Sequence, residues 1–270
     1  MLLGNEVNEL VESPTKQRVL EMIHSLSQAR KQHVEKDKMS FVWLVTGLTS
    51  QEKKLVNHVC THSSVRIVNE YSAEVTHCIA ATTIHRRQLL TRRTMKYCTA
   101  VLQHVPVLSV EWVREVAGVV DAIMQVKQKQ KDADRATFLL ALEDFPSYEK
   151  YWVVGDEQVR HRVVGGPRRS FEQSGSLLFE GMRMEVHGEF KPPLPSREAI
   201  EDLIHRGGGV VEKEEKEKEK KKKGSKREDV IVIVDKEREG GKKKAVTYYW
   251  LLDCISNYRI EEQTEYMCLF

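Results

Sequence analysis

Residues 41–47 read FVWLVTG, and this stretch decides the fold. The apolar run is short, rich in β-branched and aromatic residues, and ends at Thr46-Gly47, which is typical of a buried strand followed by a turn. From Gln51 to Cys60 the apolar residues share one helical face, so a helix is expected next. A buried strand that leads into a helix indicates a small parallel sheet covered by helices.

The same alternation continues downstream. Strands are predicted at 65–68, 76–80 and 105–109, and helices at 94–102 and around Trp112. The order then recurs near the C-terminus, with strands at 182–187, from 210 and at 230–234, and helices at 196–205 and from 247. Gly47 precedes Trp112 by 65 residues and Gly188 precedes Trp250 by 62, so two copies of one domain are the economical explanation.

The predicted organisation has four parts. These are a flexible N-terminal tail over 1–38, a first repeat over 39–117, a linker with a helical insert over 118–173, and a second repeat over 174–270. Within the second repeat, residues 212–229 mix charges of both signs without apolar content, so they are expected to form a solvated, disordered loop. A nuclear-import or anion-binding role for Lys220 to Arg227 stays open.

Composition sets broad limits on the function of this 270-residue chain. Lys plus Arg number 43 against 40 for Asp plus Glu, a net charge of +3 that names no partner. The five cysteines are odd in number and form no CxxC pair, which argues against a disulfide framework or a thiolate zinc site and indicates a reduced compartment. The N-terminus lacks a signal-peptide pattern and no apolar run is long enough to cross a bilayer, so no membrane partner is expected.

Catalytic and metal motifs are not found. The sequence contains no GxSxG, HExxH, P-loop or GxGxxG motif, so no enzyme active site and no cofactor are expected. Residues 58–62 read HVCTH, but this spacing points Cys60 away from the two histidines of a helix. A core cysteine flanked by surface histidines is the simpler interpretation, and no metal site is predicted.

Several short motifs, taken in their order, resemble the BRCT repeat family. In the first copy they are Thr46-Gly47-Leu48-Thr49, Thr76-His77-Cys78-Ile79, Arg93-Thr94-Met95-Lys96-Tyr97 and Ser109-Val110-Glu111-Trp112. In the linker and second copy they are 153–156 (VVGD), 166–169 (GPRR), 178–181 (LFEG), the triplet Gly207-Gly208-Gly209, and Thr247 with Trp250. The resemblance covers about residues 39 to 266 and implies an α/β fold: two tandem BRCT repeats, each a small parallel four-stranded sheet flanked by helices, packed head to tail.

The resemblance also implies a function. Tandem BRCT repeats bind phosphoserine peptides, so a nuclear module is expected that recruits serine-phosphorylated repair and checkpoint proteins after DNA damage. By resemblance, Thr46 donates its hydroxyl, Gly47 its amide and Lys96 its charge to the phosphate, a convergence suited to one tetrahedral dianion. Taken singly, such residues usually have ordinary roles: a glycine allows a turn, a threonine caps or pairs locally, and a lysine is solvated on a helix. The second copy has His187-Gly188 at this position, and no second phosphate site is predicted there.

A groove between the repeats is expected to read the residue three positions after the phosphoserine, as in a pSer-x-x-Phe-like motif. By resemblance its lining is Arg93 through its backbone carbonyl, Cys98, Leu194 and Leu252, and Arg93 is expected to pair with Asp253. Cys98 stands where the tandem BRCT region that this chain resembles has a large aromatic residue, so the preference for phenylalanine stays open. Core packing is the preferred interpretation of Met95 and Trp250.

Two alternative functions remain at this stage. Some BRCT domains contact DNA ends, and the lysines at 220–227 and 242–244 would suit a nucleic-acid or poly-anion binder with steep salt dependence, or a weak DNA contact. A scaffold that holds partners through apolar surface is the third possibility. The full-length relative that the motifs resemble carries a RING with ubiquitin-ligase activity, but this chain has no cysteine-histidine zinc ladder, so any such activity would come from sequence outside it.

Overall fold

The computed structural model describes residues 41–129, 145–161, 163–212, 230–236 and 244–270. The predicted tail over 1–38, the insert beyond residue 129 and nearly all of the predicted charged loop lie outside the described residues. No helix in the described ranges combines the length and the apolar character that crossing a membrane requires.

The first repeat contains a four-stranded parallel sheet, as predicted. Its strands are β1 (Val42–Thr46), β2 (Arg66–Val68), β3 (His77–Ala80) and β6 (Val107–Ser109), in the order β2-β1-β3-β6. Its helices are α2 (Ser50–Thr61), α3 (Met95–Leu102) and α4 (Val110–Lys129). Because all four strands run in one direction, β1 and β3 end side by side, with Thr46 opposite Ala80.

Side chains of β1 alternate between two cores, which explains why the strand is apolar throughout. Trp43 packs with residues of α2 and α4, and its ring lies 5.5 Å from that of Trp112. Val42 and Leu44 point to the opposite face, where they join the cluster that includes α3. The strand is therefore buried on both sides, and α3 is held against the sheet by its own apolar face.

Helix α4 runs through residue 117, where the sequence predicted the end of the first repeat. Its apolar periodicity continues past this point, since Val119, Val120 and Ile123 are all buried. The first residues of the predicted linker thus extend this helix. In the described part of the linker, two short helices follow, η2 (Glu149–Tyr151) and α5 (Gly166–Glu172).

The second repeat has the same parallel core with one addition. Its parallel strands are β8 (Arg183–His187), β9 (Val210–Val211), β10 (Val230–Val234) and β11 (Lys244–Thr247). A fifth strand, β12 (Met267–Leu269), pairs antiparallel with β11 after the turn η3 (Thr264–Tyr266). Neither β11 nor β12 was among the strands predicted by residue range. Its helices are α6 (Arg197–Arg206) and α8 (Tyr248–Asn257).

The Gly207-Gly208-Gly209 triplet allows the chain to pass closely over Phe179. A Cβ placed on Gly207 would lie 2.3 Å from the Phe179 ring, and Gly208 has a positive φ of 83°. Phe179 is fully buried and belongs to the same core as α6 and α8. The LFEG and triglycine motifs are therefore two halves of one packing contact.

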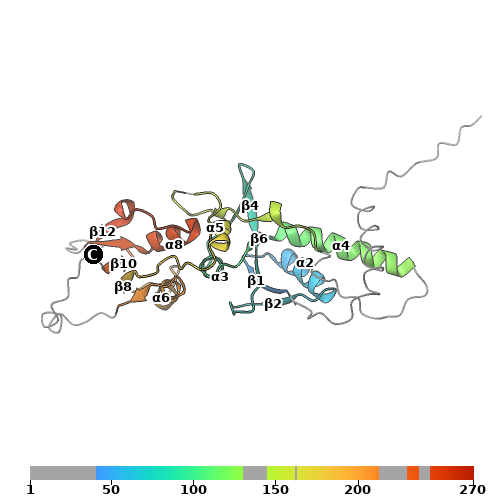
Figure 1. Cartoon of the computed structure of the whole chain (residues 1–270), viewed down its shortest axis with the longest axis horizontal. Helices are drawn as coiled ribbons and strands as arrows, with labels where there is room; N and C mark the ends of the chain where they lie inside the picture. The colour runs from blue at the N-terminus through green and yellow to red at the C-terminus, as the bar shows by residue number, and fades with distance from the viewer. Residues whose placement is uncertain (1–40, 130–144, 162, 213–229, 237–243) are drawn as a thin grey trace, which may run out of the picture.

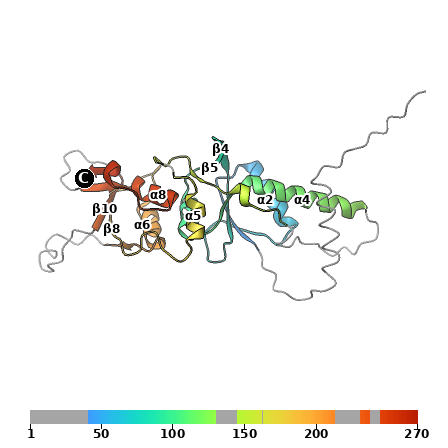
Figure 2. The same cartoon turned by 45° about the horizontal axis from the view of Figure 1, so that its top comes forward.

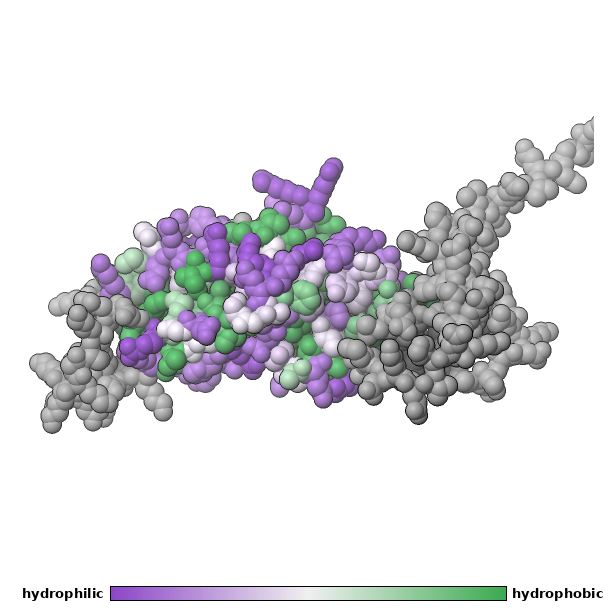
Figure 3. Space-filling view, in the orientation of Figure 1, coloured by the Kyte–Doolittle hydropathy of each residue, from purple (hydrophilic) through white to green (hydrophobic). Residues whose placement is uncertain are grey.

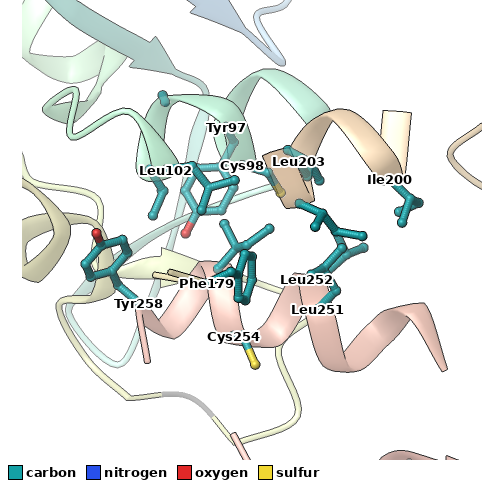
Figure 4. Close-up of a cluster of buried hydrophobic side chains, with 14 of the residues drawn as sticks. Tyr97, Cys98, Leu102, Phe179, Ile200, Leu203, Leu251, Leu252, Cys254 and Tyr258 are labelled. Carbon is teal, nitrogen blue, oxygen red and sulfur yellow. The ribbon is translucent and has the colours of Figure 1, made fainter. Parts of the chain in front are cut away.

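The two repeats stack along the long axis of the molecule. Figures 1 and 2 show the second sheet at one end, then α6 and α8, then α3, then the first sheet, and finally α2 with α4. One apolar cluster fills the space between the two sheets and joins α3 to α6 and α8 (Figure 4). The α6 and α8 helices of the second repeat thus face its neighbour, which explains the single continuous core.

A β-hairpin that the sequence did not predict projects from the first repeat. It consists of β4 (Thr82–His85) and β5 (Gln88–Thr91), and β7 (Gly155–Asp156) from the linker adds to β5. Arg86 and Arg87 form its two-residue turn, with φ of 48° and 64°. The Asn-Gly signal that normally identifies such a turn is missing, which is why sequence patterns passed over it.

Candidate functional site

The end of β1 presents a buried hydroxyl next to an exposed glycine. Thr46 is 5% exposed and is the last residue of the strand. Gly47 follows with a φ of 69°, a conformation that glycine adopts without steric cost. Thr49 then begins α2 by a capping box with Glu52, so the chain turns sharply away and leaves the glycine open.

Thr94 brings the start of α3 to this strand end. Its hydroxyl lies 2.7 Å from the Thr46 hydroxyl and accepts a hydrogen bond from the Tyr97 amide at 3.1 Å. Thr94 is therefore the N-cap of α3, and the positive end of the helix dipole points at the end of β1. Thr94 was not among the predicted site residues, although a threonine just before an apolar helix is the usual sign of an N-cap.

Lys96 supplies the positive charge. It stands in the first turn of α3 and its Nζ lies 3.4 Å from the Val45 carbonyl oxygen, within the last two residues of β1. The ammonium is also close enough to Cys78 to oppose the rise in pKa that burial imposes on that thiol, which reaches about 12. The structure thus places the Lys96 amine beside the strand that carries Thr46, as a convergent anion site requires.

The corresponding position of the second repeat is filled. Gly188 follows β8 with a φ of 128°, and a Cβ placed on it would lie 2.4 Å from the Asp235 carboxylate carbon. The Asp235 carboxylate accepts hydrogen bonds from the amides of Glu189 at 3.1 Å and Lys236 at 2.9 Å. The chain's own carboxylate therefore lies beside Gly188 and accepts from amides that follow this strand end.

Arg93 joins the two repeats and the linker. Its Nε donates to Asp156 at 2.8 Å and its Nη2 to Asp253 at 2.5 Å, so the predicted Arg93–Asp253 pair is confirmed. All three side chains are at least 95% buried. Burial alone would lower the Arg93 pKa, but the two carboxylates raise it above its usual range, and the guanidinium stays charged.

Hydrogen bonds satisfy most of the remaining atoms of this network. Tyr266 donates its hydroxyl to Asp253 at 2.8 Å, and the amides of Gln158 and Val159 donate to Asp156. Sequence reasoning missed the role of Asp156, although the VVGD motif that contains it was noted. A carboxylate in a linker carries no sign of its partner, which lies 63 residues away along the chain.

The predicted groove residues meet between the repeats, but they differ in exposure. Cys98 has no exposed surface and Leu252 is 4% exposed, so both lie inside the inter-repeat core (Figure 4). Leu194 is half-buried at the edge of the same cluster, as is Met95. Trp250 is fully buried, which confirms its predicted packing role. Leu194 and Met95 therefore offer the accessible apolar surface at this edge.

Other candidate residues have structural roles. The His58 side chain pairs with Asp121 at 2.8 Å, and its ring lies 5.1 Å from that of His62. Within the described ranges, no group of three or more metal-binding side chains comes together. The five cysteines are free, and burial raises the pKa of Cys98 to about 12, which makes its thiol unreactive.

Two family models match this chain. A family model described as the BRCA1 C Terminus (BRCT) domain matches residues 31–117, and one described as a BRCT domain matches residues 177–267. Together the two matches cover most of the chain. No curated protein sequence matches it.

Solved structures with similar folds share little sequence with this chain. The BRCT5-BRCT6 domains of S. pombe Brc1 are 14% identical, with 82% of this chain and 94% of that chain covered and a TM-score of 0.48. Rtt107p in complex with a phosphorylated histone is 10% identical, with coverage of 87% and 94% and a TM-score of 0.41. Rad4 BRCT1,2 in complex with a Crb2 phosphopeptide is 15% identical, with coverage of 85% and 99% and a TM-score of 0.30.

Proposed function

Because this chain belongs to the BRCT family and carries two BRCT domains in tandem, we propose that it binds phosphoserine peptides through its first repeat. Thr46 donates its hydroxyl to the phosphate, Gly47 its amide and Lys96 its ammonium. The observation that carries this proposal is the position of the Lys96 amine, 3.4 Å from the Val45 carbonyl at the end of β1. The N-terminus of α3 adds a positive dipole at the same place.

The energy of such a site is large enough for a specific interaction. A hydrogen bond to a charged group contributes about 1.5 to 3 kcal/mol, and micromolar binding needs about 8 kcal/mol in total. Two or three such bonds would supply a large part of this energy, so loss of the phosphate should abolish most of the binding. We propose no comparable site in the second repeat, where the Asp235 carboxylate lies beside Gly188 and accepts from the Glu189 and Lys236 amides.

The groove between the repeats provides specificity in this proposal. A peptide residue three positions after the phosphoserine would lie against the Arg93 carbonyl and Leu194, with Cys98 and Leu252 behind them. The ion pairs of Arg93 hold the repeats at a constant separation, so the distance between phosphate site and groove is constant as well.

At the level of the cell, the proposed role is to recruit serine-phosphorylated repair and checkpoint proteins in the nucleus. Three segments resemble the tandem BRCT region at the C-terminus of the breast cancer type 1 susceptibility protein: Val153-Val154-Gly155-Asp156, Gly166-Pro167-Arg168-Arg169 and Leu178-Phe179-Glu180-Gly181. We therefore propose that this chain is homologous to that region. The tandem repeats bind partners and carry no catalytic step; the ubiquitin-ligase activity of that relative resides in its RING.

The test compares a fluorescent pSer-x-x-Phe peptide with its unphosphorylated twin by anisotropy. The phosphorylated peptide should bind with micromolar affinity and at least about tenfold more tightly than the twin. Lys96→Met should remove this difference while the fold stays intact. Lys236→Met, which removes an exposed lysine from the second repeat, is the matched control and should change nothing. Equal affinity for the two peptides would overturn the proposal, and a steep salt dependence would then favour the nucleic-acid alternative.

A further inference from the structure

The tip of the β4–β5 hairpin is a basic cluster on a rigid support. His85, Arg86 and Arg87 follow one another there and all three are exposed. Four pairs of residues, from Thr82 opposite Thr91 to His85 opposite Gln88, hold the two strands together. In Figure 3 hydrophilic side chains project beyond the rest of the surface where Figure 1 places β4.

The arginines at the turn are costly residues for that position. Arg86 and Arg87 both have positive φ, the conformation of a type I′ turn, in which Asn-Gly is strongly preferred. Residues with a Cβ lose stability in this conformation. Two adjacent arginines kept at a site that disfavours both indicate a role for the side chains rather than for the turn.

These charges have no partner within the described part of the chain. No ion pair of the described residues includes Arg86, Arg87 or Arg92. The carboxylate that does contact the hairpin, Glu157, accepts a hydrogen bond from Thr83, in the middle of β4 rather than at the tip. The guanidinium groups are therefore available to a ligand.

The base of the hairpin lies next to the proposed phosphate site. The chain enters the hairpin from Ala81, the residue nearest to the Cβ position of Gly47, and leaves it towards Thr94, which contacts Thr46. The Thr91 hydroxyl donates to the Ala81 carbonyl at 2.9 Å and closes the base. Each strand has four residues, so the tip lies roughly 13 Å beyond this base, the length of about four extended peptide residues.

We propose that this hairpin binds acidic side chains that flank the phosphoserine by about four residues. Arginine is suited to this because its planar guanidinium pairs with a carboxylate through two parallel hydrogen bonds. The inference rests on the proposed function, since the phosphate places the peptide next to the hairpin. The ligand class is thereby narrowed to phosphopeptides with Asp or Glu near the phosphorylated serine, such as the products of acid-directed serine kinases.

The experiment is a cycle of two proteins and two peptides. One phosphopeptide carries Glu at the third to fifth positions on both sides of the phosphoserine, except at the position that enters the groove, and the other carries Gln there. The variant Arg86→Asn/Arg87→Gly removes both charges and installs the preferred turn sequence, so the hairpin is retained. Arg66→Gln/Arg183→Gln removes two exposed arginines at the amino ends of the two sheets and is the control.

The native protein should prefer the Glu peptide by about five- to tenfold at low salt, and less at high salt. The hairpin variant should lose this preference while keeping its preference for phosphorylated over unphosphorylated peptide, and the control should keep both. Equal affinity for the Glu and Gln phosphopeptides overturns the inference alone. Loss of phosphate discrimination in the native protein overturns the proposed function instead. Binding of a DNA duplex that is lost in the hairpin variant, without any Glu preference, would assign the arginines to nucleic acid and overturn the inference.

Discussion

Each of the two repeats contains its own parallel sheet, but the first strands of the two sheets end differently. In the first repeat, β1 ends with a hydroxyl and an open glycine, and Lys96 reaches the same place from α3. In the second repeat, β8 ends with His187-Gly188, and the Asp235 carboxylate is bound to the amides that follow. The same backbone turn thus presents positive donors in one repeat and a satisfied carboxylate in the other.

The fold therefore determines where a binding site can lie, and the side chains at that position determine its function. In the first repeat, α3 connects β5 to β6 and carries the lysine. In the second repeat, nine residues separate β10 from β11, and the two of them that the structure describes, Asp235 and Lys236, are not helical. Helix α3 is buried on two sides, because it packs on both the first sheet and the second repeat. Lys96 thus stands on a helix of the first repeat, and no described residue of the second repeat takes its place.

The largest expected effect comes from breaking the contact between the repeats. Arg93→Met leaves the buried carboxylates of Asp156 and Asp253 without their cation, and such a change costs about 3 to 5 kcal/mol. Denaturant unfolding should show this loss. Arg114→Met, which breaks an exposed pair with Glu111, should cost less than about 1 kcal/mol. Similar stability of the two variants would contradict the structural role of Arg93.

The second prediction compares one threonine from each repeat. Thr46→Val removes the hydroxyl proposed to bind phosphate and should weaken phosphopeptide binding by about ten- to a hundredfold. The control is Thr247→Val at the start of α8, because the Thr247 hydroxyl is buried without a hydrogen-bond partner in the described structure. That variant should bind peptide like the native protein and be no less stable. Isothermal titration would measure both, and unchanged binding by Thr46→Val would remove the hydroxyl from the site.

Acid should destabilise the first repeat through His77. This side chain is packed against Phe41 and Trp112, and burial lowers its pKa to about 4. Its ordinary value in the unfolded chain is about 6.5, so between these values only the unfolded chain binds the proton. Stability should therefore fall as the pH drops below 6.5, by about 2 kcal/mol at pH 5.

His77→Asn should abolish that part of the acid sensitivity. The measurement is denaturant unfolding at pH 7.5 and pH 5.0 for the native protein and the variant. His85→Asn, at the exposed hairpin tip, is the control and should retain the native response. A native response in the His77 variant would mean that another group accounts for the acid sensitivity.

The smallest effect is expected at the filled site of the second repeat. Asp235→Ala removes the acceptor of the Glu189 and Lys236 amides and should cost about 1 kcal/mol of stability. It should not create a second phosphate site, because Lys96 has no counterpart among the described residues of that repeat. Titration with a phosphoserine peptide should still give one peptide per chain. A stoichiometry of two would show that the carboxylate alone suppresses binding.

Much of the architecture could be predicted because its signals are local. The apolar run at 41–45, the helix at 51–60 and the repeated spacing from glycine to tryptophan identify two parallel α/β units. The hairpin at Thr82–Thr91 and the strand β12 were not predicted, because their residues lack a clear alternation of apolar and polar side chains and a recognised turn sequence. The continuation of α4 past residue 117 was not predicted, because the end of a helix depends on what the helix packs against.

The candidate site divides in the same way. Thr46, Gly47 and Lys96 were named from motifs, but Thr94 and Asp156 became visible only through their contacts. The predicted groove residues were brought together, yet the burial of Cys98 depends on how closely α3 approaches α6 and α8. The exposure of a side chain depends on how the helices pack, and it cannot be predicted from the residues next to it in the sequence.

By itself the sequence determined the two sheets, their covering helices and the residues able to bind an anion, because the periodicity of apolar residues and the chemistry of each side chain act within a few positions. The tertiary structure alone decided that Thr94 meets Thr46, that Arg93 is shared by two carboxylates, and that Asp235 fills the second strand end. These contacts join residues 45 to 160 positions apart, and their geometry depends on the packing of whole elements.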